Sequence, residues 1–178
     1  METIITIIIW AAVIQGLLLG VIFISSKKHH SLANRLLGSF LLTFVFAALS
    51  DMLPFGEIGT YSISGYFTLP EVKMLFPVLF LNFVLEKVGR SSSYRLFLRF
   101  HYFLAFGLIS LTFFNIILHL FSGKSLLDLL GWKYLEPFYM GQQYYAFILT
   151  MCAFVIALRE TWRYRNCLTS AMSGTRVA

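Results

Sequence analysis

Charged residues are scarce in this sequence, and acidic residues are the scarcest of them. Asp, Glu, Lys and Arg make up only 12% of the 178 residues, and eight of these residues are acidic. Soluble domains carry roughly 25% charged residues, which cover their water-exposed surface. Because 58% of the chain is hydrophobic and lies in long runs, this composition excludes an ordinary soluble domain. It predicts an all-α, polytopic integral membrane protein.

Cysteine is nearly absent as well. Of the two cysteines, Cys152 lies inside an apolar run and Cys167 lies near the C-terminus, so the chain has no disulfide framework and no cysteine spacing for a metal. It also has no paired carboxylates within an apolar run, no nucleophile–base pair and no phosphate-binding loop. We therefore predict that the protein is not an enzyme, has no catalytic residues, and needs neither a metal nor a cofactor.

Positive charge is missing before the first apolar run and abundant after it. Glu2 is the only charged side chain before this run. The segment Lys27–Arg35 after it carries three formal positive charges and no acidic residue. A cleavable signal peptide carries its positive charge in front of its apolar part, so this run should remain as a membrane span. Short loops rich in Lys and Arg stay in the cytoplasm, which places the N-terminus outside.

The remaining apolar runs predict four more spans. The five predicted spans are 4–25, 36–53, 70–88, 100–120 and 139–158, within one membrane domain of residues 1–165. With the C-terminus inside, every Lys and Arg except Lys73, Lys124 and Lys133 falls on the cytoplasmic side. We predict a multi-pass protein of a bacterial inner membrane, with a disordered cytoplasmic tail over residues 166–178.

Three local patterns predict features of the membrane domain. Gly16 and Gly20 lie four residues apart, so they share a helix face on which a second helix can approach closely. Pro77 lies inside the third span, where it should kink the helix. The leucine- and aromatic-rich segment Ser122–Phe138 predicts a short interfacial helix outside the membrane.

A polar line on the fourth span is the nearest approach to a site. Thr112, Asn115 and His119 fall on one face at 100° per residue, together with His101 at the inner end. Polar residues at membrane depth suggest a functional site, so Asn115 and His119 line a ligand cavity, hydrogen-bond a neighbouring helix or reach interfacial water. With Tyr144 at an apolar mouth, the candidate ligand-binding residues are Thr112, Asn115, His119 and Tyr144, and the ligand is unknown.

Several segments, taken in their order along the chain, resemble a known family. They are Gln15–Gly20 (Gln-Gly-Leu-Leu-Leu-Gly), Ser31–Leu37 (Ser-Leu-Ala-Asn-Arg-Leu-Leu), Phe76-Pro77 and His101 at the start of the fourth span. Over roughly residues 10–165 this order resembles the N-terminal membrane domain of multi-pass AraC-type transcriptional regulators. The chain departs from that pattern in having Phe80 or Phe83 in place of a tyrosine, and in lacking a helix-turn-helix segment before Ala178.

The resemblance implies a non-enzymatic sensor or anchor module in the membrane, either truncated or stand-alone, without direct binding to nucleic acid. Its partners would be the lipid bilayer and either further copies of the chain or another membrane protein. The alternative from the sequence is a small oligomeric transporter or channel subunit.

Overall fold

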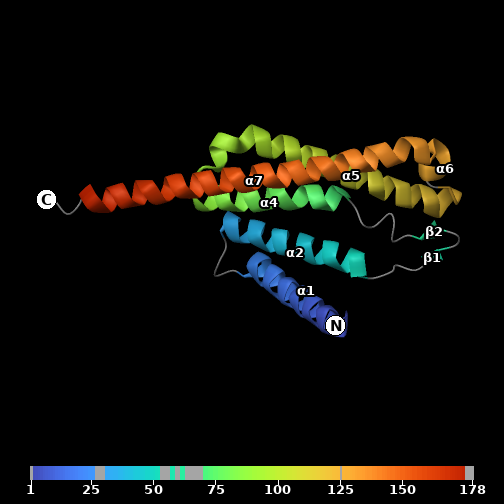
Figure 1. Ribbon diagram of the computed structural model, residues 1–178, viewed down its shortest axis with the longest axis horizontal. Coiled ribbons are helices and arrows are strands. Elements are labelled where there is room, and N and C mark those ends of the chain that lie inside the picture. The colour runs from blue at the N-terminus through green and yellow to red at the C-terminus, as the bar shows by residue number, and fades with distance from the viewer. Residues whose placement is uncertain are drawn as a thin grey trace.

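The apolar runs form helices because a helix pairs its backbone N–H and C=O groups within the run itself. The computed structural model describes residues 2–26, 31–52, 57–58, 61–62, 70–124 and 126–174. Its elements are listed in chain order: α1 (Glu2–Ser25), α2 (Leu32–Met52), β1 (Glu57–Ile58), β2 (Tyr61–Ser62), α4 (Pro70–Lys87), the 3-10 turn η2 (Ser91–Tyr94), α5 (Arg95–Ser122), α6 (Leu126–Leu130) and α7 (Trp132–Gly174). The two short strands pair antiparallel, and the rest of the described architecture is helical (Figure 1).

Within the described residues of this all-α structure, three segments are long and apolar enough to cross a membrane: Thr6–Ser25, Ser91–Ser122 and Lys133–Ser170. The apolar part of α2, Leu32–Ala48, is shorter. Helix α4 has 18 residues but carries Glu71, Lys73, Glu86 and Lys87. Length and composition therefore support a membrane location, with three helices of spanning character.

Helix α4 occupies the centre of the structure, where it packs against α2, α5 and α7 (Figure 1). Leu81 and Leu85 of α4 are completely buried. They pack with Ala153 and Ala157 of α7 and with Leu98 of α5 in one hydrophobic cluster. Because alanine side chains are small, they let α7 lie close against the leucines of α4. Helix α4 continues through Pro77, whose side chain is buried. The kink that the sequence predicts at this residue stays a prediction.

Helix α1 packs on α2 through glycines. A Cβ atom placed on Gly38 would lie 2.8 Å from the carbonyl oxygen of Gly20, and one placed on Gly16 would lie 2.8 Å from Val45. Such distances leave no room for a side chain, so the close approach predicted for Gly16 and Gly20 is confirmed. The other faces of α1 are largely exposed, as at Ile7 and Leu18.

Helices α5 and α7 are longer than the predicted spans. Helix α5 begins at Arg95, and α7 begins at Trp132 and continues to Gly174. The prediction of a disordered tail is corrected over residues 166–174, which are helical; residues 175–178 lie outside the described residues. The helix persists because the sequence has neither glycine nor proline between Gln142 and Ser173. The predicted short outer helix corresponds to α6, which ends at Leu130 and is followed by Gly131 with a positive φ of 75°.

Candidate functional site

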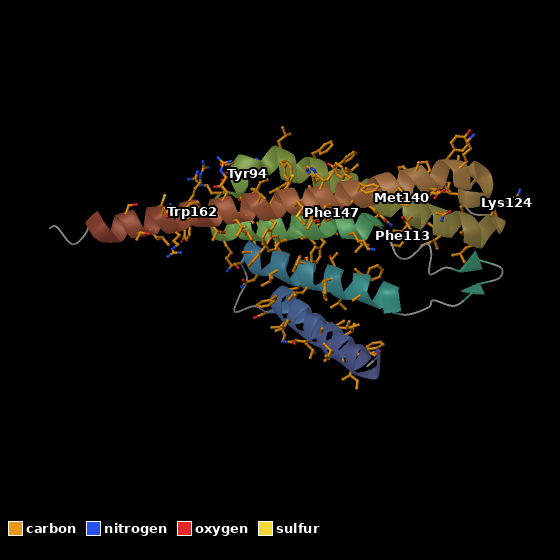
Figure 2. The ribbon with its side chains drawn as sticks, in the orientation of Figure 1. Tyr94, Phe113, Lys124, Met140, Phe147 and Trp162 are labelled. Atoms are coloured by element: carbon orange, nitrogen blue, oxygen red, sulfur yellow. The ribbon has the colours of Figure 1, made fainter. Side chains whose placement is uncertain are left out.

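The basic residues of separate segments meet at one end of the bundle. Lys87 at the end of α4 donates a hydrogen bond from Nζ to Oδ1 of Asn34 in α2, over 3.4 Å. Tyr94 of η2 donates to Oε1 of Glu160 in α7, over 2.9 Å. We call this end, with Lys87, Arg90, Arg95, Arg99, Arg159 and Arg163, the basic end. Lys124 lies at the opposite end, beside α6 (Figure 2).

The turn between α4 and η2 determines how the basic end is built. Gly89 has a φ of 69°, a left-handed conformation that favours glycine. The N–H of Arg90 donates to the carbonyl of Leu85 at 2.8 Å, and the N–H of Gly89 donates to that of Glu86 at 3.3 Å. This pair of bonds is the Schellman arrangement that closes a helix. It reverses the chain sharply, so that the start of α5 lies over the end of α4.

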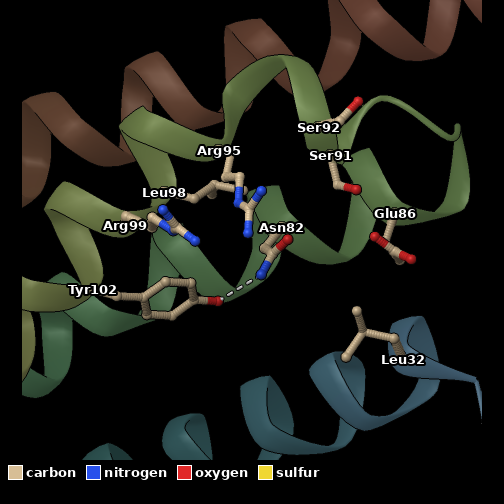
Figure 3. Close-up of a pocket in the computed structure, with 9 residues that line it drawn as sticks. All are labelled: Leu32, Asn82, Glu86, Ser91, Ser92, Arg95, Leu98, Arg99 and Tyr102. Atoms are coloured by element: carbon tan, nitrogen blue, oxygen red, sulfur yellow. Dashed lines mark hydrogen bonds between the residues drawn. The ribbon is translucent and has the colours of Figure 1, made fainter.

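A cavity of about 380 Å³ lies at this reversal (Figure 3). Its lining comes from α2, α4, η2 and α5 and consists of Leu32, Asn82, Glu86, Ser91, Ser92, Arg95, Leu98, Arg99 and Tyr102. Asn82 donates from Nδ2 to the hydroxyl oxygen of Tyr102 over 3.0 Å, which links α4 to α5 across the cavity. The cavity therefore combines two arginines with a polar hydrogen-bonded pair.

The two arginines of the cavity are exposed and lie one helical turn apart on α5. Arg163 forms an ion pair with Glu160 at 3.3 Å. By contrast, neither Arg95 nor Arg99 has a carboxylate partner within 4 Å among the described residues. Figure 3 shows both guanidinium groups beside Asn82, with Glu86 further along the cavity. This part of the cavity is positively charged and can accept an anion.

The predicted site residues separate into a buried pair and an exposed tyrosine. Thr112 and Asn115 are 7% and 5% exposed, so these two side chains point into the protein. Asn115 accepts a hydrogen bond from the N–H of Leu126 over 2.7 Å, and Thr112 donates to the carbonyl of Leu108 in its own helix. The side chain of Tyr144 is 68% exposed, and the structure does not bring it to the buried pair. The side chain of His119 lies outside the described residues.

The hydrogen bond of Asn115 explains why an amide is present at that position. Its oxygen satisfies the first N–H group of α6, which has no partner within its own helix. Asn115 therefore has a structural role, as in the alternative of a hydrogen bond to a neighbouring helix. The bond connects α5 to α6, however, and not to another predicted span.

His101 forms a buried contact that the sequence does not reveal. This histidine is 7% exposed, with Nδ1 2.8 Å from the carbonyl oxygen of Phe97 and Nε2 3.0 Å from the hydroxyl of Tyr145. A carbonyl oxygen only accepts, so Nδ1 carries the hydrogen, and in the neutral ring Nε2 accepts from Tyr145. His101 and Tyr145 are 44 residues apart, which no local pattern indicates.

Gln142 is a second polar residue that the sequence does not single out. It is 6% exposed, on the face of α7 that also buries Ala146. Both polar atoms of its amide are buried and lack a hydrogen-bond partner among the described residues. Among those same residues, no group of three His, Cys, Asp or Glu side chains could hold a metal ion.

Comparison with known proteins adds no assignment, since no family model, no curated protein and no solved structure matches this chain.

Proposed function

We propose that this protein is a non-enzymatic membrane module that senses a signal or anchors a partner, with α7 connecting its membrane part to the cytoplasm. The single observation that carries the proposal is the continuity of α7. One helix of 43 residues runs along α4 within the bundle and then past the basic end (Figure 1). At 1.5 Å per residue this helix is about 65 Å long, roughly twice the thickness of a bilayer core.

The part of α7 beyond the bundle is well suited to contact another protein or domain. Every described residue from Thr161 to Ser170 is exposed, and Figure 2 shows Trp162 on this extension. A helix is stiff along its axis, so a rotation or shift of α7 within the bundle would appear at the extension. This geometry agrees with the sensory role that the resemblance to membrane domains of AraC-type regulators implies.

The proposal includes five spans in a bacterial inner membrane, with the basic end in the cytoplasm. Clustered Lys and Arg favour the cytoplasmic side, and the bonds Lys87–Asn34 and Tyr94–Glu160 bring the predicted cytoplasmic segments together. Helix α4 is about 27 Å long, close to the thickness of a bilayer core. Its charged residues lie in its first and last turns, where they can reach the interface.

Insertions into α7 can distinguish a sensor from a simple anchor. One to four alanines would be inserted after Arg165 in a chain fused at its C-terminus to a DNA-binding reporter domain that must dimerise. Each alanine turns the fused domain by about 100°. A sensor helix predicts reporter output that alternates with the helical repeat, with a three- or four-residue insertion restoring much of it. Output that does not depend on insertion length would reduce the role to an anchor.

A transporter or channel makes a different prediction. Purified protein in proteoliposomes would then release or take up a solute above the rate of empty vesicles. We expect no such flux.

A further inference from the structure

We infer that the cavity at the basic end binds the phosphate group of an anionic membrane phospholipid. The inference rests on the membrane placement proposed above, and it does not depend on whether α7 transmits a signal. The two guanidinium groups of Arg95 and Arg99 lie on the same side of α5 and face one cavity (Figure 3). Like charges one helical turn apart repel each other, and an anion between them removes that repulsion.

Arginine has the right geometry for a phosphate. Its planar guanidinium group presents parallel N–H donors that match two oxygens of one phosphate. Arg95 and Arg99 make no ion pair with a described carboxylate, in contrast to Arg163, which is paired with Glu160. Their donors are therefore available to a ligand.

The polar side of the cavity offers a further donor. Tyr102 accepts the hydrogen bond from Asn82 through its hydroxyl oxygen. Its own O–H hydrogen is used in no other hydrogen bond of the described residues, so it can donate to a phosphate oxygen. Because Asn82 holds the hydroxyl from α4, this donor is fixed in place before a ligand arrives.

The charge of the cavity favours a phosphodiester. Arg95 and Arg99 contribute two positive charges, and Glu86 contributes one negative charge on the far side of the cavity. The resulting single positive charge matches the single negative charge of a phospholipid phosphodiester. Inorganic phosphate and phosphate monoesters carry between one and two negative charges at neutral pH, and Glu86 disfavours the more charged form.

The surroundings of the cavity supply a place for acyl chains. Leu96, Phe100 and Phe103 of α5 are 84%, 58% and 80% exposed, and Leu32 at the start of α2 is 56% exposed. Leu32 lines the cavity, and each of the three α5 residues directly follows a cavity-lining residue in the sequence. These apolar side chains lie at the end of the bundle where phospholipid headgroups are expected to lie. A lipid can satisfy both parts at once, whereas free phosphate uses only the polar part.

The test is equilibrium binding of fluorescent phosphatidylglycerol to the purified full chain in detergent. The double variant Arg95→Gln/Arg99→Gln should bind this lipid at least about tenfold more weakly, because charge-assisted hydrogen bonds are lost. The matched control Arg159→Gln/Arg165→Gln removes the same charge from exposed positions outside the cavity and should change the affinity less than about twofold. Equal weakening in both doubles would reduce the binding to general attraction and overturn the site.

Competition identifies the source of the phosphate. Unlabelled short-chain phosphatidylglycerol should displace the fluorescent lipid, and inorganic phosphate at the same concentration should not. Displacement by inorganic phosphate alone would assign the cavity to a soluble anion and overturn the lipid assignment. Absence of saturable binding would overturn the inference as a whole.

A second variant keeps the test valid if the double arginine variant fails to fold. Tyr102→Phe removes a single hydroxyl and should weaken phosphatidylglycerol binding several-fold while the chain still melts cooperatively. Unchanged binding in this variant would exclude Tyr102 from the site and contradict the arrangement described here.

Discussion

The α1–α2 pair and the α4–α5–α7 core are held together in opposite ways. Helices α1 and α2 meet where side chains are missing, at Gly20 and Gly38. The core is held by side chains that are present, namely the Leu–Ala cluster and the hydrogen bonds of Tyr94 with Glu160 and His101 with Tyr145. In a bilayer, apolar burial alone hardly distinguishes protein from lipid, so close backbone packing and interhelical hydrogen bonds provide specificity. This protein uses one device in each region.

The largest predicted effect comes from filling the glycine contact. Gly38→Leu places its Cβ within 2.8 Å of the Gly20 carbonyl oxygen, and backbone cannot move aside as a side chain can. We expect a loss of about 3 kcal/mol or separation of α1 from α2, measured by unfolding in detergent and by crosslinking between the two helices. The control is Gly107→Leu, because a Cβ on Gly107 meets nothing within 4 Å. An equal loss in both variants would contradict the contact.

The next effect tests the hydrogen bonds of the core. Glu160 is 3% exposed and accepts from both Tyr94 and Arg163. Glu160→Ala should destabilise the protein by about 2 kcal/mol because both donors lose their acceptor. Tyr94→Phe should cost about 1 kcal/mol alone and almost nothing when added to Glu160→Ala. Additive losses in chemical denaturation would mean that the two side chains do not act together.

The contrast between the α1–α2 pair and the α4–α5–α7 core explains how much of each region can be predicted from the sequence. Gly16 and Gly20 lie one turn apart, so a local pattern reveals the face on which α2 packs. The hydrogen bond between Tyr94 and Glu160 joins residues 66 positions apart, and only the fold brings them together. The same reason explains the cavity, because Arg95 and Asn82 come from antiparallel helices whose register depends on the turn at Gly89. The lengths of the apolar runs predict where the helices lie. They underestimate the length of α7, because the polar residues that follow its apolar run continue the helix where glycine and proline are absent.

A smaller effect is expected at Asn115. If Asn115 has only a structural role, the sequence alone predicts that Asn115→Leu is tolerated or even stabilises the protein. The structure changes that expectation, because Asn115 caps the first N–H of α6, and loss of a cap costs about 1 kcal/mol. Thr112→Val should be close to neutral, because among the described residues Thr112 bonds only within α5, at 3.3 Å. Thermal unfolding of both variants in detergent checks the difference, and a neutral Asn115→Leu would contradict the cap.

The smallest effect has the opposite sign. Gln142 has a buried amide without a partner among the described residues, so Gln142→Leu should be neutral or stabilise the protein by up to about 1 kcal/mol. The neighbouring Gln143→Leu is the control, because Gln143 is exposed. A clear loss of stability in Gln142→Leu alone, seen by thermal unfolding, would show that the amide has a partner in the folded protein.

The central claim is that the helices form a membrane bundle with its basic end in the cytoplasm, and cysteine labelling in spheroplasts tests it most directly. On a Cys152→Ala/Cys167→Ala background, single cysteines would replace the exposed Ser92 at the basic end and the exposed Lys124 at the α6 end. A maleimide that cannot cross the membrane should label Lys124→Cys in intact spheroplasts and Ser92→Cys only after permeabilisation. Labelling of Ser92→Cys in intact spheroplasts, with Lys124→Cys protected, would reverse the orientation and contradict the account.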